Sequence, residues 1–376
     1  MEKRKVTNME VKKANRNRVF RYICQHETVS NPDIAYAMKM SLPTATQITK
    51  ELIESGLVEE KGELESTGGR RAKALSAVVN VRLAAGLDIT KNHVSMVLIN
   101  LSGEILKYQR VHCPYVCEDI YYEKASAMLE AFFDESGVDR ERILGIGISF
   151  PGIIDLDGER IADSHVLGVG DVPFEAISRF FGYPCFFLND ANAGAYAEGI
   201  RMEEGKSSFF YLSLSNTVGG AFFYDGQLIQ GENFRCGEVG HMTLVPEGEC
   251  CYCGKNGCLD VYCSAMRLAE QAEGKLEDFF VSLKKREDSA VKIWDKYTTY
   301  LAAAINNIHM VLDCDIVLGG YVGSCMEEYI GDIQEKVAGR NTFGEDGGFV
   351  RAGRNKVGAA ALGAALWIME IFVEQV

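Results

Sequence analysis

The sequence predicts an α/β protein in which an N-terminal helix-turn-helix with a β-wing precedes a larger, two-lobed body. Residues 1–80 contain three amphipathic helical stretches followed by two short strand patterns. From Leu83 onward the pattern changes to strands interspersed with helices. A chain of 376 residues is also too long for one ordinary domain. We therefore expect one domain at 1–80 and a second unit at 81–376.

The composition favours a globular protein with a basic N-terminal end. With 47% hydrophobic residues the chain can bury sizeable cores. No charged segment followed by an apolar one opens it, and no apolar run reaches about 18 residues, so we expect a cytoplasmic protein without membrane contact. The formal charge is -14, yet residues 1–80 hold 14 Lys+Arg against 10 Asp+Glu, which leaves -18 for the remainder. A basic end on an acidic protein indicates nucleic-acid contact there.

The N-terminal helices follow from periodicity and capping signals. Residues 15–25 place apolar side chains on one helical face, and Ser30 opens a second helix that runs to about residue 39. Ser41-Leu-Pro-Thr44 opens a third helix, which Gly56 ends. The turn between the second and third helices is short, as a helix-turn-helix requires. Two short strands around Gly62 complete the predicted wing.

The third helix is the candidate DNA-reading element. Its exposed polar side chains suit mixed phosphate and base contacts with double-stranded operator DNA. After the wing, Gly68-Gly-Arg-Arg71 forms a basic arm able to enter a minor groove. The alternative is a small helical protein-interaction module, against which the wing and the arm argue. The candidate DNA-binding residues are Ser41, Thr44, Thr46, Gln47, Lys50, Arg70 and Arg71.

The body contains two successive units of strand meander and helix. The first has strands at 83–89, 93–100, 104–112 and 143–150, a helix at 119–136, and a strand at 185–188 that leads into Asn189-Asp-Ala-Asn192. The second has strands at 209–214, 219–224 and 227–230, and later 316–318 before Gly319-Gly320. We expect lobe one at about 81–195 plus a C-terminal helix at 357–376, and lobe two at about 196–356. Such lobes close on ligands by hinge motion.

A cluster of cysteines predicts a structural zinc site. The run Cys251-Tyr-Cys253-Gly-Lys-Asn-Gly-Cys258 follows His241 by ten residues. Three thiolates and one imidazole can close a tetrahedral site without an open position, and Gly254 and Gly257 allow the tight bend. The alternative is a set of buried free thiols. The nearby Cys250 and Cys263 are the competing ligand assignments.

Taken together, these motifs resemble one family. The winged helix, the Gly-Arg-Arg after it, Asn189-Asp-Ala-Asn192, Gly237-Glu-Val-Gly-His-Met242 and the cysteine motif are similar to those of the ROK family of repressors, open reading frames and kinases. The likeness covers nearly all of residues 10–375. It implies an actin-like fold of the sugar-kinase and ribonuclease-H-like type for the body.

The resemblance also implies a sugar site. Asp190 corresponds to the general base that takes a proton from the sugar hydroxyl, and Asn189, Glu238 and His241 to residues that hydrogen-bond the sugar. His241 would then bind zinc with one nitrogen and face the sugar with the other. Asp260 stands where the family usually has a glutamate that completes the sugar site, and is therefore the fifth candidate sugar-binding residue. The alternatives are a helix N-cap for Asp190 and a structural ion pair for Glu238.

Both phosphate loops depart from the family's kinases. Asp88-Ile-Thr-Lys-Asn92 replaces Asp-x-Gly-Gly-Thr, and Ser215-Asn-Thr217 replaces Gly-Thr-Gly. The glycines let backbone amides approach phosphates, so their loss predicts poor binding of ATP. Gly319-Gly320, on the family's adenine side, remains.

The sequence therefore predicts a regulator rather than an enzyme. We expect a sugar-responsive repressor of carbohydrate-metabolism genes that binds a monosaccharide or sugar derivative and acts as a homodimer or higher homo-oligomer. Residues 66–79, which join the wing to the body, are expected to transmit the signal. The alternatives are an active ATP-dependent sugar kinase with a DNA-binding domain, and a ligand-independent regulator that binds a partner protein.

Overall fold

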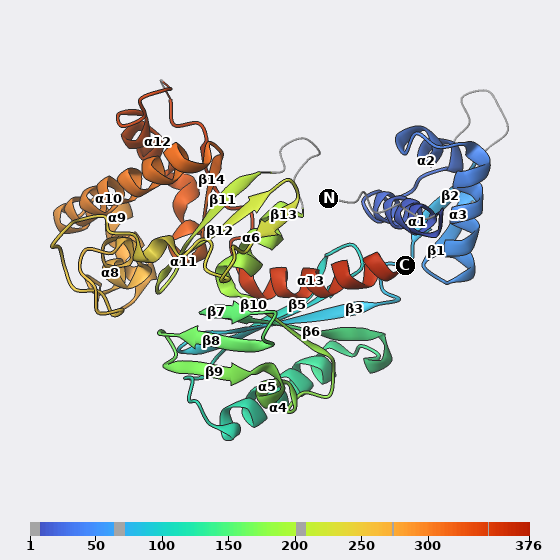
Figure 1. Ribbon diagram of the computed structural model, residues 1–376, viewed down its shortest axis with the longest axis horizontal. Coiled ribbons are helices and arrows are strands. Elements are labelled where there is room, and N and C mark those ends of the chain that lie inside the picture. The colour runs from blue at the N-terminus through green and yellow to red at the C-terminus, as the bar shows by residue number, and fades with distance from the viewer. Residues whose placement is uncertain (1–7, 64–71, 201–207, 273, 345) are drawn as a thin grey trace.

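The computed structural model describes residues 8–63, 72–200, 208–272, 274–344 and 346–376 (Figure 1). The N-terminal head has the predicted order of three helices and two strands: α1 Asn8–Cys24, α2 Asn31–Ala37, α3 Leu42–Glu54, β1 Val58–Glu63 and β2 Lys73–Ala77. The first helix begins seven residues earlier than its apolar periodicity indicates, because the first turns are exposed and carry no apolar face. Ser30 and Ser41 cap α2 and α3 as predicted.

The first lobe is built on a five-stranded sheet in the order β10-β6-β3-β4-β5. Its strands are β3 Leu83–Ile89, β4 His93–Asn100, β5 Ile105–His112, β6 Ile143–Phe150 and β10 Cys185–Asn189, and its helices are α4 Asp119–Ser136 and α5 Phe174–Ser178. A second sheet of three antiparallel strands was not predicted: β7 Ile153–Asp155, β8 Arg160–Ser164 and β9 Val169–Pro173. Strands of three to five residues with charged side chains give no clear alternating pattern.

The second lobe repeats the arrangement of the first. Its sheet has the order β13-β12-β11-β14-β15, and in both sheets a three-stranded antiparallel meander is extended by two parallel strands. The strands are β11 Phe209–Leu214, β12 Val218–Tyr224, β13 Gln227–Ile229, β14 Asp315–Gly319 and β15 Val350–Ala352. The helices are α7 Leu259–Cys263, α8 Ala265–Ala269, α9 Leu276–Lys284, α10 Asp288–Leu312, α11 Gly320–Gly323 and α12 Ile330–Ala338. The repeat confirms the predicted two-lobed α/β body.

Two helices lie at the centre of the molecule, α6 Asp190–Gly199 and α13 Ala359–Gln375. In Figure 1, α13 lies along the sheet of the first lobe, and its C-terminal end points toward the head. It contacts β3, β6 and α6, and its C-terminal half contacts α1. One buried apolar cluster therefore includes residues of the head, both lobes and α13. Within the described ranges, no helix is long and apolar enough to cross a membrane.

Candidate functional site

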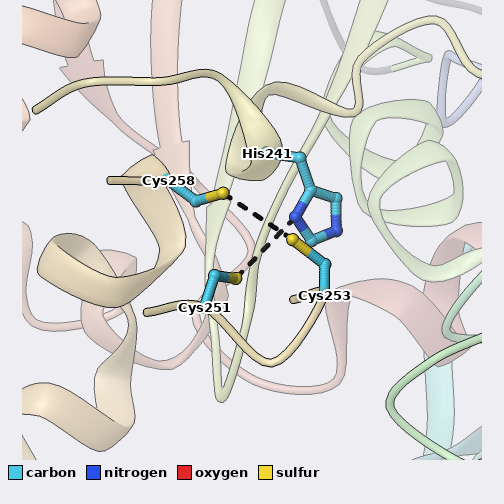
Figure 2. A group of neighbouring side chains, drawn as sticks. All are labelled: His241, Cys251, Cys253 and Cys258. Carbon is cyan, nitrogen blue, oxygen red and sulfur yellow. Dashed lines mark hydrogen bonds between the residues drawn. The ribbon is translucent and has the colours of Figure 1, made fainter. Parts of the chain in front are cut away.

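The residues of the predicted zinc site lie together (Figure 2). The ligand atoms of His241, Cys251, Cys253 and Cys258 all lie within 4.8 Å of one another. The sulfurs of Cys253 and Cys258 are 3.8 Å apart, and Cys251 Sγ is 4.0 Å from His241 Nδ1. Zinc–sulfur bonds of about 2.3 Å at a tetrahedral ion place two sulfurs about 3.8 Å apart. The four side chains thus fit a tetrahedral metal ion of the zinc type.

The local chain path explains why these ligands meet. Gly254 and Gly257 have φ angles of 80° and 75°, in the left-handed region that favours glycine. The N–H of Cys251 donates to the carbonyl of Lys255 at 2.8 Å, which closes the knuckle. His241 arrives from the short 3-10 turn Val239–His241, which an isolated bridge between Thr243 and Cys258 joins to the knuckle.

The two competing cysteines do not belong to the cluster that the described residues form. Cys250 is exposed, and its thiol points to the carbonyl of Cys251. Cys263 is buried in the second lobe, where its thiol faces the carbonyl of Tyr297 at 3.9 Å. Geometry thus favours the four-residue set over either substitute.

The candidate sugar residues of the first lobe lie where β10 ends and α6 begins. Asn189 is the N-cap of α6: its Oδ1 accepts from the N–H of Asn192 at 3.0 Å, while its Nδ2 donates to the carbonyl of Gly152 at 2.9 Å. Asp190 is the first residue of α6, and its Oδ1 accepts the N–H of Ala191 at 2.9 Å. Burial raises the pKa of Asp190 to about 6, and the nearby charge of Glu238 adds to the rise.

The candidate residues of the second lobe surround the metal cluster. Glu238 is exposed to solvent, yet partial burial of its carboxyl group raises its pKa, while the charges of His165 and Arg235 act against the rise. His241 turns Nδ1 to the thiols and Nε2 to the hydroxyl of Tyr252, 3.4 Å away. The second imidazole nitrogen therefore already has a polar neighbour in Tyr252.

Asp260 has a different environment from the other candidates. Its side chain is 4% exposed, and Oδ2 accepts the backbone N–H of Val218 at 2.7 Å. Burial raises the pKa of Asp260 to about 6. The carboxylate thus holds the start of β12 next to α7, and it is less accessible to a ligand than Glu238.

Sequence reasoning assigned no role in the site to three residues near the candidate sugar residues. Asp88, at the end of β3, is 8% exposed and accepts a hydrogen bond from Ser149 Oγ at 2.9 Å. Burial first, and the charge of Asp190 second, raise the pKa of Asp88 to about 7. Tyr252 was treated only as a spacer between two cysteines. His165, whose Nδ1 is 3.1 Å from Asp163, has its ring 6.5 Å from that of His241. His165 lies between β8 and β9 of the unpredicted small sheet, so no sequence signal placed its ring near His241.

In each of the two altered phosphate loops, a backbone N–H group donates a hydrogen bond within the loop itself. The N–H of Thr90 donates to the carbonyl of His93 at 3.0 Å, and the N–H of Ser215 donates to the carbonyl of Thr217 at 3.1 Å. Arg110 of the first lobe stacks on Tyr321 of the second, 4.9 Å from the ring centre, and donates to its hydroxyl at 3.3 Å. Both amides are therefore occupied within their own turns, and a side-chain contact joins the two lobes nearby.

The candidate DNA-reading residues lie on the exposed side of α3, which buries Ala45, Ile48 and Leu52 on its other side. Ser41 Oγ accepts the N–H of Thr44 at 3.3 Å, so its hydroxyl also serves as the helix cap. Gln47 Nε2 donates to Glu51 at 3.0 Å. Thr44, Thr46, Gln47 and Lys50 are exposed. Arg70 and Arg71 lie outside the described residues.

Comparison with known proteins identifies the family. The model of the ROK family matches residues 84–371, and the chain belongs to this family. The xylose repressor of Caldicellulosiruptor bescii is 32% identical over 267 residues, which are 69% of this chain and 65% of that protein.

Solved structures of the same fold include both regulators and kinases. A ROK family transcriptional regulator, a homologue of the E. coli MLC protein, matches 97% of this chain and 100% of its own length, with a TM-score of 0.76 and 22% identity. A ROK family glucokinase from Streptomyces griseus, solved with glucose and AMPPNP, matches 76% of this chain and 98% of its own length, with a TM-score of 0.65 and 22% identity. The likeness to the regulator thus extends over nearly the whole chain.

Proposed function

We propose that this protein is a sugar-responsive transcriptional repressor of carbohydrate-metabolism genes. The observation that carries the proposal is the fusion of a helix-turn-helix head to a ROK body, matched over 97% of the chain by a regulator. A relative named as a xylose repressor supports the same reading and makes a monosaccharide the expected effector. The division is a DNA-binding domain at 1–80 and a sugar-binding body at 81–376, in which α13 completes the first lobe.

The effector site lies between the lobes. Asn189 and Asp190 approach from the first lobe and Glu238 and His241 from the second, so hydroxyl groups of one sugar can be read from both sides. Asp260 supports this site from behind, through its bond to Val218. A ligand bridging the two lobes binds the closed arrangement better than the open one, which is the condition for shifting a conformational equilibrium.

The body acts as a sensor and does not phosphorylate the sugar. Phosphoryl transfer depends on positioning the nucleotide, for which backbone N–H groups must be free to reach the phosphates. In this chain Thr90 and Ser215 donate those groups within their own turns. The runner-up function is an active sugar kinase, which the likeness to a glucokinase keeps open for testing.

The metal is proposed to be a structural Zn²⁺. His241, Cys251, Cys253 and Cys258 would hold it, since thiolate and imidazole ligands in a closed four-residue set are typical of structural zinc. When bound, the ion would cross-link the turn that carries Glu238 and His241 to the cysteine knuckle. The knuckle in turn orients the hydroxyl of Tyr252 toward His241.

The head is proposed to read the operator as part of a cytoplasmic homodimer or larger homo-oligomer. The N-terminal part of α3 would contact base edges in the major groove, and the arm with Arg70 and Arg71 would contact the adjacent minor groove. A symmetric dimer places two such heads on the half-sites of a roughly palindromic operator.

The test uses the full-length protein and DNA fragments that it selects from a random library. Operator affinity is measured by fluorescence anisotropy with and without xylose, glucose and their phosphates, and ATP turnover is measured on the same panel. One sugar should change operator affinity by about 5- to 150-fold, the usual range of allosteric coupling. Sugar-dependent ATP turnover well above background would favour the kinase. Specific DNA binding that no sugar alters would favour a regulator controlled by a partner protein.

A further inference from the structure

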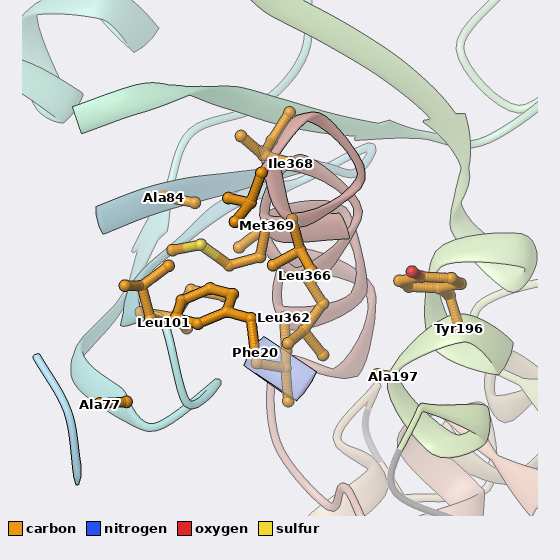
Figure 3. Packing of buried hydrophobic residues seen from close by; sticks show 14 of the residues in the cluster. Phe20, Ala77, Ala84, Leu101, Tyr196, Ala197, Leu362, Leu366, Ile368 and Met369 are labelled. Atoms are coloured by element: carbon orange, nitrogen blue, oxygen red, sulfur yellow. The ribbon is translucent and has the colours of Figure 1, made fainter. Parts of the chain in front are cut away.

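The head is docked directly on the C-terminal helix of the body. The guanidinium group of Arg21 on α1 forms two hydrogen bonds to the carboxylate of Glu370 on α13. One turn away on each helix, Asn17 Nδ2 donates to the backbone carbonyl of Glu374 at 3.1 Å. Phe20, between these two residues, is fully buried. It belongs to the same cluster as the apolar face of α13, as Figure 3 shows. The head therefore has an attachment to the body besides the connecting segment.

The same helix is in contact with the helix that begins at the sugar site. α6 starts at Asp190 and packs along α13. Tyr196 of α6 is 6% exposed, with its ring 5.0 Å from that of Trp367 on α13. Burial raises the pKa of Tyr196, and the charge of Glu370 is the next largest cause. Tyr196 thus packs on Trp367, three residues before Glu370 on α13, and Glu370 binds Arg21 of the head, so α6, α13 and the head meet at these residues.

The path from the sugar to the head is short and rigid. Asp190 and Tyr196 lie on one helix, six residues and about 9 Å apart at 1.5 Å per residue. Because a helix of ten residues moves as one body, a displacement of its first turn also displaces Tyr196. Gly363 of α13 lies so close to Ala193 of α6 that an added Cβ would come within 1.7 Å of the Ala193 carbonyl oxygen. Because the two helices are closely packed at this point, α6 cannot shift without moving α13 or its side chains.

We infer that Tyr196, Glu370 and Arg21 are positioning residues that set the orientation of the DNA-binding head according to the state of the sugar site. This inference rests on the proposed function, because it requires a sugar that acts at Asp190. The segment at 66–79, which the sequence suggested as the transmitter, lies partly outside the described residues. The contact between α1 and α13 provides a route that is independent of it.

The test measures coupling rather than binding alone. The coupling factor is the ratio of operator dissociation constants with and without saturating sugar, obtained by anisotropy on the full chain. Glu370→Gln and Tyr196→Phe each remove one polar interaction of the relay and leave the shape of the side chain nearly unchanged. The matched control is Glu123→Gln on α4, which removes the same charge from an exposed side chain outside the contact between α1 and α13.

The expected result is a loss of coupling with both ligands still bound. Glu370→Gln and Tyr196→Phe should lower the coupling factor at least fivefold. The sugar dissociation constant, measured by calorimetry without DNA, should stay within twofold of the wild-type value. Glu123→Gln should behave as the wild type. Exchanging the charges in Arg21→Glu with Glu370→Arg should restore part of the coupling that either single change removes, a recovery that general loss of packing would not produce.

Two results would overturn the inference, and they are distinguishable. If the wild-type protein responds to a sugar and both variants respond equally well, the relay is wrong while the proposed function stands. If no sugar changes operator affinity in the wild type, the proposed function fails and the relay has no signal to carry. A variant that fails to fold is recognised by loss of sugar binding and of its circular dichroism signal. In that case the charge exchange between Arg21 and Glu370 tests the relay: recovery of coupling supports it, and no recovery contradicts it.

Discussion

Replacing Gly363 by alanine should separate the two central helices and destabilise the protein. The added Cβ would lie 1.7 Å from the carbonyl oxygen of Ala193 and 2.4 Å from its carbonyl carbon. Ordinary contact begins near 3.4 Å, so α6 and α13 would have to move apart by about 1.7 Å. Both clashing groups are helix backbone, and α13 is also held against the sheet of the first lobe. Neither side can therefore yield by a simple change of rotamer.

The expected cost is at the upper end of what overpacking of a core produces, about 3 kcal/mol. The matched control is Gly331→Ala on α12, where no atom lies within 4 Å of the added Cβ. That change should be neutral or stabilising by up to about 1 kcal/mol, because alanine loses less backbone entropy on folding. Urea denaturation followed by circular dichroism compares the midpoints. Equal midpoints for the two variants would refute the argument from close packing.

Three further outcomes are expected. Metal analysis should find about one zinc per chain, and Cys258→Ser should lower this sharply; full metal content in the variant would contradict the assignment. Sugar affinity should fall as pH drops through about 6, the raised pKa of Asp190, because the protonated carboxyl loses an acceptor. Calorimetry from pH 5 to 8 should show this dependence, and Asp190→Asn should weaken it, leaving the contribution of Glu238, whose pKa is also raised. Operator binding should weaken steeply as the salt concentration rises. Gln47→Ala should relax base preference, whereas Arg70→Ala should weaken binding to all sequences alike. Anisotropy on matched and mismatched sites would show both effects.

The raised pKa of Asp190 also determines how its carboxyl group changes the stability of the fold with pH. Its folded-state pKa of about 6 lies above the ordinary value of 3.8, so the folded protein binds the proton more tightly than the unfolded chain does. Its contribution therefore destabilises the fold as pH rises from about 4 through 6. Without sugar, Asp190→Asn should gain stability relative to the wild type at pH 8 and little at pH 4. A larger gain at pH 4 would contradict the raised pKa.

Several parts of this protein could be predicted because their signals are local in the sequence. The serines that cap α2 and α3 act on amides three residues away, and the metal knuckle closes within eight residues. The small sheet β7–β9 could not be predicted, since its short strands alternate too few times to show a buried face. The position of His165 near His241 could not be predicted either, because His165 lies between two strands of this sheet.

By itself the sequence determined the family, the order of the elements, the cluster of one histidine and three cysteines, and the absence of glycines from both phosphate loops. Each of these depends on residue types at fixed, short spacings. Tertiary structure alone decided that Asp88 and Asp190 share one buried environment, and that Arg21 meets Glu370 across 349 positions of the chain. Burial and long-range contact are properties of the folded core, in which a helix from the last twenty residues packs against the first lobe, α6 and the head together. No pattern within a short window of sequence carries that information, because many arrangements of the same amphipathic elements would satisfy it equally well.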